Sequence, residues 1–208
     1  MKHVAIFVCC LFLYVSDASA QVYLNEILAD PASDWDGDAT INSRSDEWVE
    51  IVNVGSIPID LTSYRLGDLS GGLSWRFGFS GSLAPGSTQI VYGSDSVAWE
   101  QANGFPAFGL SLNNGGDTVF LYDLSSGDTV TVDQYSYSAF EVEDDRAAGR
   151  DPDGTGPWEI FDALNPYSGA TPPFGNGCVP TPGESNECTA TVPTEQSTWG
   201  AIKALYSN

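Results

Sequence analysis

DTVFLYDLSSGDTVTVDQYSY, residues 117–137, is the stretch that decides the fold class. Apolar and polar side chains alternate along residues 117–124 and again along residues 128–137, and both runs are rich in β-branched and aromatic residues. The segment Ser125-Ser126-Gly127 between them supplies small residues and a glycine, which favour a tight reversal of the chain. The stretch therefore predicts an antiparallel β-hairpin.

Further strands are predicted upstream of this hairpin, separated by turns that contain Gly or Pro. In residues 73–79 we expect Leu73, Trp75, Phe77 and Phe79 on one side, because side chains alternate across a strand. A short helix is predicted over residues 96–104. Short strands at intervals of about ten residues predict an all-β antiparallel sandwich. The upstream strands are expected at residues 22–29, 47–55, 59–68, 73–79 and 88–94.

The chain begins with the pattern of an export signal. Residues 1–3 form a short basic start, residues 4–15 are apolar without interruption, and Ala18 and Ala20 match the small residues that signal peptidase recognises. We therefore expect a mature chain that begins at Gln21 and is secreted or held at the cell surface. A membrane anchor is the alternative, but a spanning helix needs roughly 20 apolar residues. No later segment of the sequence is apolar enough to cross a membrane.

The composition is strongly acidic, with a formal net charge of −21 at pH 7. Such a surface repels phosphate groups, so we expect neither nucleic acid nor acidic lipid as a partner. Hydrophobic residues make up 42% of the chain and aromatic residues 12%, which is enough for a core and argues against disorder. Beyond residue 20 the basic residues are Arg44, Arg65, Arg76, Arg146, Arg150 and Lys203.

The C-terminal part has a different composition. From about residue 171 the chain is rich in Thr, Pro, Gly and Asn, and residues 171–198 are interpreted as a linker or tail. Cys178 and Cys188 lie in this tail, and an even pair in an exported protein predicts a disulfide. A zinc site is not expected, because it needs about four N or S ligands. The ending STWGAIKALYSN has apolar residues at helical spacing and predicts a short helix.

Five blocks of the sequence, taken in order, resemble the lamin tail domain as found in bacterial secreted proteins. The resemblance implies an immunoglobulin-like β-sandwich without catalytic residues, which acts as an interaction or structural module. It divides the chain into a signal (1–20), a sandwich domain (21–170) and a tail (171–208). The blocks are VYLNEILADP (22–31), DEWVEIVNVGSIPIDLTSYRLGD (46–68), LAPGSTQIVY (83–92), FGLSLNNGGDTVFLYD (108–123) and GRDPDGTGPWEIF (149–161).

The segment DWDGDATINSRSDE, residues 34–47, is the best candidate for a metal site. Calcium prefers six to eight oxygen ligands from a flexible loop, and three alternating aspartates around a glycine supply carboxylates on one side of such a loop. The loop departs from a full EF-hand pattern at its sixth and twelfth positions. An ordinary solvated acidic loop is the alternative. The expected Ca²⁺ ligands are Asp34, Asp36, Asp38, Thr40 and Asp46.

Two other acidic segments are expected to be structural. Residues 149–161 predict a turn in which Trp158 packs onto the sandwich, with a second cation site as the alternative. Residues 141–146 are interpreted as a solvated loop.

Catalysis has little support, because the only histidine, His3, lies in the expected signal. Without it, triads of the Ser-His-Asp type are excluded, and an acid-residue hydrolase is the remaining enzymatic alternative. A calcium-assisted carbohydrate-binding module is the alternative to an interaction or structural module, with Trp35 inside the acidic loop as its most informative residue. The partner is therefore an unidentified protein or polysaccharide. The candidate sugar-stacking residues are Trp35, Tyr64, Trp75, Tyr92 and Trp99. Packing in the core is the other interpretation of these aromatic residues.

Overall fold

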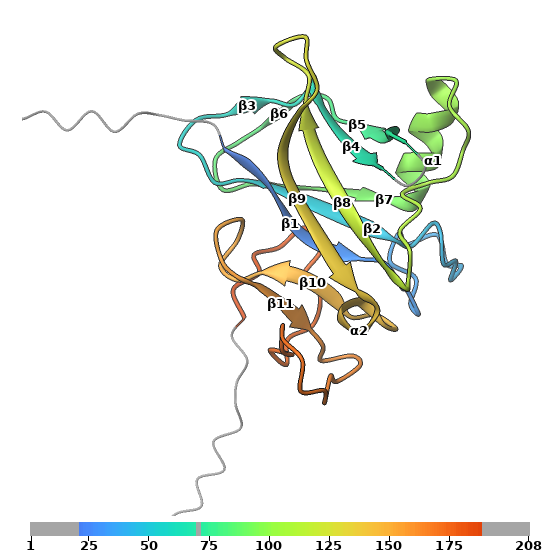
Figure 1. The fold of residues 1–208 in the computed structure, drawn as a ribbon, viewed down its shortest axis with the longest axis vertical. Helices are drawn as coiled ribbons and strands as arrows, with labels where there is room; N and C mark the ends of the chain where they lie inside the picture. The colour runs from blue at the N-terminus through green and yellow to red at the C-terminus, as the bar shows by residue number, and fades with distance from the viewer. Residues whose placement is uncertain (1–20, 70–71, 189–208) are drawn as a thin grey trace, which may run out of the picture.

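A computed structural model describes residues 21–69 and 72–188. The chain forms two β-sheets packed face to face, and the longer helix lies at one end (Figure 1). The first sheet has the strand order β11-β10-β1-β2-β7 and the second has the order β5-β4-β8-β9. Neighbouring strands in both sheets are antiparallel. The predicted immunoglobulin-like β-sandwich is confirmed.

The elements follow the predicted order closely. The first sheet contains β1 (Val22–Leu28), β2 (Trp48–Asn53), β7 (Thr88–Tyr92), β10 (Ala147–Arg150) and β11 (Trp158–Phe161). The second contains β4 (Tyr64–Asp68), β5 (Ser74–Gly78), β8 (Gly116–Asp123) and β9 (Val130–Ser138). A ribbon joins β3 (Ile59–Asp60) to β6 (Ser82–Leu83), and the helices are α1 (Gly93–Ala102) and α2 (Ala139–Val142).

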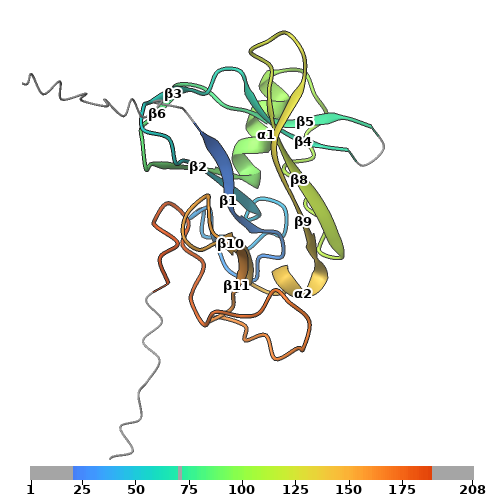
Figure 2. The same ribbon diagram turned by 60° about the vertical axis from the view of Figure 1, so that its left-hand side comes forward.

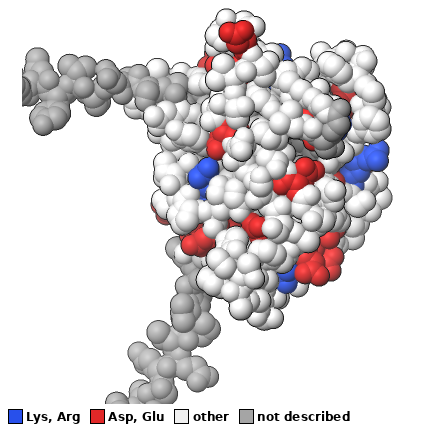
Figure 3. Space-filling view, in the orientation of Figure 1, with Lys and Arg blue, Asp and Glu red and all other residues white. Residues whose placement is uncertain are grey.

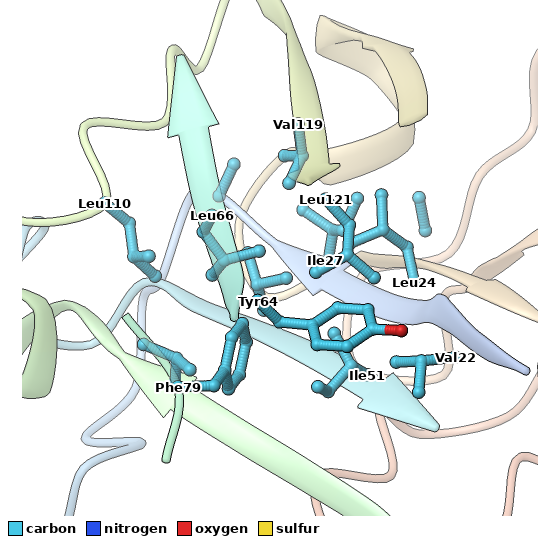
Figure 4. Packing of buried hydrophobic residues seen from close by; sticks show 14 of the residues in the cluster. Val22, Leu24, Ile27, Ile51, Tyr64, Leu66, Phe79, Leu110, Val119 and Leu121 are labelled. Atoms are coloured by element: carbon cyan, nitrogen blue, oxygen red, sulfur yellow. The ribbon is translucent and has the colours of Figure 1, made fainter. Parts of the chain in front are cut away.

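The core lies between the two sheets. Figure 4 shows side chains of β1 and β2 pointing toward those of β4 and β8. Burial of branched and aromatic side chains supplies the main driving force for folding, at roughly 1.5–3 kcal/mol per fully buried side chain. Trp158 is partly buried against this core, so its predicted packing is confirmed. The residues labelled in the figure include Leu24, Ile27, Ile51, Leu66, Val119 and Leu121.

A β-bulge in β1 changes which side chains face the core. The pairing with β2 shifts between Leu24 and Glu26, which leaves Asn25 as an extra residue. Leu24 and Ile27 therefore both lie in the core, whereas Glu26 and Leu28 point to the outer face of the sheet. Glu26 is nevertheless buried completely, because another part of the chain covers that outer face.

A second bulge lies where β5 pairs with β4. The Cα partners run from Leu66 and Phe77 directly to Gly67 and Trp75, so Arg76 is the extra residue. Phe77 packs against the core, while Trp75 contacts Tyr122 edge-on at 5.5 Å between ring centroids. The expectation that Trp75 shares one side of the strand with Phe77 is wrong, because the bulge reverses the alternation.

Residues 171–188 pack against the sandwich instead of acting as a free linker. Figure 2 shows this orange-red segment passing beside β10 and β11. The predicted disulfide between Cys178 and Cys188 is present in the structure, with 5.9 Å between the Cα atoms. The segment donates hydrogen bonds to side chains of β1 and β2, and these contacts explain why it is ordered. The predicted terminal helix and the predicted signal lie outside the described residues.

The part of the chain that the structure describes contains no helix long and apolar enough to cross a membrane.

Candidate functional site

The acidic loop between β1 and β2 brings three aspartates together. One carboxylate oxygen from each of Asp34, Asp36 and Asp38 lies within 4.8 Å of the others. Gly37 and Ala39 both have positive φ, at 79° and 67°, and these two left-handed residues wind the loop tightly around the carboxylates. The convergence is the one that the alternating sequence predicts.

Backbone N–H groups of the loop hold these carboxylates in place. The carboxylate of Asp34 accepts the N–H of Gly37 and of Ala39, both at 2.8 Å. Asp36 accepts the N–H of Asp38 at 3.1 Å, and Asp38 accepts that of Thr40 at 2.7 Å. None of the ion pairs among residues 21–69 and 72–188 involves these aspartates. Their mutual repulsion is therefore relieved only by dipoles and by solvent, and a cation would lower it further.

Asp46 and Thr40 play different parts from the three converging aspartates. Asp46 is completely buried and is not a member of the group of carboxylates that come within 4.8 Å. Its carboxylate accepts the N–H groups of Trp35, Asp36 and Asn42 at 2.7–3.0 Å. Asp46 therefore fixes the loop from the inside, and Thr40 contributes its N–H to Asp38.

Trp35 anchors the same loop to the sandwich. Its ring lies 6.0 Å from that of Trp48, and its indole N–H donates to Asp145 at 2.8 Å. Asp145 also accepts the N–H groups of Ala32 and Ser33. Asp145 is thus buried and structural. The interpretation of residues 141–146 as a solvated loop is wrong for this segment, in which only Glu143 and Asp144 are exposed.

The aromatic residues do not form a single sugar-stacking face. Tyr64 is buried in the core, and Trp35 packs on Trp48. Trp75 instead joins two residues that sequence reasoning missed, Phe105 and Phe108. These three rings line a cavity of about 310 Å³ between β5, α1 and the loop that follows α1.

The cavity combines exposed rings with a paired cation. Phe105 is 40% exposed and Phe108 is 51% exposed, and Phe105 stacks on Trp99 of α1 at 5.4 Å. At the cavity wall the guanidinium of Arg76 pairs with Asp68 at 2.9 Å and with Glu100 at 3.4 Å. The wall therefore presents no uncompensated positive charge to a ligand.

Comparison with protein families matches residues 16–139 to the model of the Lamin Tail Domain. This range covers more than half of the chain and includes the acidic loop, α1 and the hairpin of β8 and β9. Comparison with curated proteins and with solved structures found no match.

Proposed function

The chain belongs to the lamin tail domain family, a family of non-enzymatic immunoglobulin-like interaction modules, and from this premise we propose that it is an exported interaction or structural module with a calcium-stabilised acidic loop. The convergence of Asp34, Asp36 and Asp38 is the observation that supports the calcium site. Hard divalent cations bind carboxylate and carbonyl oxygens of flexible loops in this way. The hydrolase alternative is not proposed, because the family is non-enzymatic.

The proposed partner is a protein or a polysaccharide at the cell exterior. The signal pattern of residues 1–20 supports export. On the face shown in Figure 3, acidic side chains are scattered over a mostly uncharged surface and basic side chains are few. This distribution, with a net charge of −21, disfavours nucleic acid and leaves uncharged surface for a partner.

Calcium is expected to raise the thermal midpoint of the mature chain, residues 21–208, by about 5 °C or more over the value in chelator. A ligand that binds only the folded state stabilises it by about 2.7 kcal/mol at a concentration of 100 Kd, which corresponds to several degrees for a domain of this size. The variant Asp34→Asn/Asp36→Asn/Asp38→Asn should lose this rise. Calorimetry at fixed pH with calcium or chelator measures both midpoints.

The matched control for this experiment is Asp128→Asn/Glu184→Gln/Glu187→Gln, which removes three exposed charges elsewhere. It should keep the full response to calcium, because it changes the net charge equally without touching the loop. If the unmodified chain has the same midpoint with calcium and with chelator, residues 34–47 are an ordinary solvated loop and the calcium site is contradicted.

Carbohydrate binding is the second candidate, and the aromatic cavity is the observation that favours it. Ligand sites are commonly cavities of about 300–1,000 Å³ lined by aromatic side chains with a few polar groups, and the cavity at Trp75 has about 310 Å³. The side chain of Arg44 in the acidic loop lies close to Gly109, since a Cβ placed on Gly109 would stand 3.1 Å from it. Gly109 follows the cavity residue Phe108 in the chain, so calcium would assist binding by ordering the loop through this contact.

If this candidate is right, Phe108→Ala should weaken binding of a neutral hexasaccharide by about fivefold or more, since an aromatic contact contributes on the order of 1 kcal/mol or more. Titration calorimetry with cellohexaose, xylohexaose and mannohexaose measures the affinity. Phe174→Ala is the control, because this residue is 57% exposed but does not line the cavity. Binding that is unchanged in Phe108→Ala, or absent for every saccharide, would remove the second candidate.

A further inference from the structure

The disulfide-closed segment of residues 176–188, here called the latch, covers two buried glutamates. Glu26 of β1 and Glu50 of β2 are direct Cα partners on the outer face of the first sheet, and both side chains are fully buried. Thr181 donates its N–H to Glu26 at 3.2 Å, and Gly183 donates its N–H to Glu50 at 2.7 Å. The latch therefore closes directly over a pair of carboxyl groups.

No cation compensates this pair among the residues that the structure describes. The guanidinium of Arg150 in β10 is turned away, since it donates to the carbonyl of Leu24 and to Asp133 and lies over the ring of Trp158. The remaining ionisable groups around the pair are acids or a phenol. They are Asp151 and Asp153 in the turn after β10, Glu159 in β11, Glu184 and Glu187 in the latch, and Tyr92 in β7.

The hydroxyl of Thr181 lies between Glu26 and a second acceptor, Asn186. The amide N–H₂ of Asn186 donates to the carbonyls of Asn25 and Arg150, so its Oδ1 is free only to accept. The Thr181 hydroxyl lies 2.7 Å from that Oδ1 and 2.9 Å from a carboxyl oxygen of Glu26. A hydroxyl carries one hydrogen. If Thr181 donates it to Asn186, the contact with Glu26 is a hydrogen bond only when Glu26 is the protonated donor.

The electrostatics of the site also favour protonated carboxyl groups. Burial, together with the neighbouring Glu50, raises the pKa of Glu26 from 4.5 to about 8 despite the hydrogen bonds from Thr181. Burial likewise raises the pKa of Glu50 from 4.5 to about 7. Both carboxyls are thus largely neutral in mildly acidic solution and become charged between about pH 7 and pH 8.

We propose that residues 176–188 form a proton-dependent latch, which is held over β1 and β2 while Glu26 is protonated and is released when Glu26 and Glu50 ionise together. Ionised Glu26 would lie buried beside Glu50 and Asp153 without a counter-charge. Release exposes both carboxylates to water. The latch is independent of calcium, because its carboxyls are separate from the acidic loop.

Amide hydrogen exchange of the mature chain tests the latch. The release equilibrium should rise by up to about tenfold per pH unit for each carboxyl that ionises on release. After correction for intrinsic rates, protection within residues 176–188 should fall at least about tenfold between pH 5.5 and pH 8, while protection in β8 falls less. Equal losses in the latch and in β8 would mean general destabilisation and would overturn the proposal.

Glu26→Gln provides the matched variant, because the amide cannot ionise and keeps an oxygen that accepts from Thr181. It should lose less latch protection between pH 5.5 and pH 8 than the unmodified chain, since only Glu50 of the pair can then ionise, whereas Glu184→Gln, an exposed change in the latch itself, should behave like the unmodified chain. Glu50→Gln gives a second test if Glu26→Gln folds poorly. A pH response that survives in Glu26→Gln/Glu50→Gln, which has neither carboxyl, would also overturn the proposal.

Discussion

Between pH 5 and pH 8 the mature chain is expected to lose on the order of 5 kcal/mol of its free energy of unfolding. Three buried glutamates carry this effect. Burial raises the pKa of Glu26 and of Glu47 from 4.5 to about 8 and that of Glu50 from 4.5 to about 7. Glu47 lies apart from the latch contacts, and its carboxyl accepts the N–H of Leu112 at 3.2 Å.

The sign of this dependence follows from proton binding. Between the ordinary pKa of 4.5 and the raised values, the folded chain holds protons that the unfolded chain has released. The stabilisation is therefore complete below about pH 4.5 and is lost as the pH rises toward 8. Asp60 acts in the opposite sense, because the N–H of Thr62 lowers its pKa, so its contribution is lost only in acid.

Urea unfolding at pH 5, 6.5 and 8, with the calcium concentration held fixed, measures this loss. The urea midpoint should fall by about 2 M from pH 5 to pH 8 if the slope is near 2 kcal/mol per M. The variant Glu26→Gln/Glu47→Gln/Glu50→Gln should show a nearly flat profile, because it has no proton to lose in this range. A profile that stays as steep in this variant would show that other groups carry the pH dependence.

The strand pattern predicted the sandwich well because β1, β2, β4, β8 and β9 each bury one face on a common core. It could not reveal the bulges in β1 and β5, since an inserted residue reverses the alternation without leaving a mark in the sequence. These bulges create the features that sequence reasoning missed. One turns Glu26 toward the latch, and the other turns Trp75 toward the aromatic cavity.

The latch itself could not be predicted from local patterns either. Its order depends on hydrogen bonds that N–H groups of Thr181, Gly183 and Asn186 donate to acceptors more than a hundred residues away in the sequence. The Pro- and Gly-rich composition of the segment is typical of a linker. Local propensity does not record such long-range contacts, so nothing in the local sequence indicates that the segment packs. The disulfide was predictable, since two cysteines leave one possible pairing.

Asp46 was predicted as a calcium ligand from spacing alone, and its burial leads to a second large expected effect. Asp46→Ala should lower the stability of the chain by about 3 kcal/mol or more. Its carboxylate accepts three backbone N–H groups, those of Trp35, Asp36 and Asn42, in a site with no exposure to solvent. A buried donor left without a partner costs roughly 1–3 kcal/mol, so losing the acceptor of three donors is expected to loosen the whole loop.

The measurement in chelator separates this role from metal binding. If Asp46 acts as an internal anchor, Asp46→Ala has a midpoint well below that of the unmodified chain even without calcium. Asp34→Asn/Asp36→Asn/Asp38→Asn, whose residues lie on the outside of the loop, should match or exceed the unmodified chain in chelator, because it removes repulsion. The opposite result would be an Asp46→Ala midpoint that equals that of the unmodified chain in chelator and falls below it only when calcium is present. Asp46 would then be a metal ligand and not an anchor.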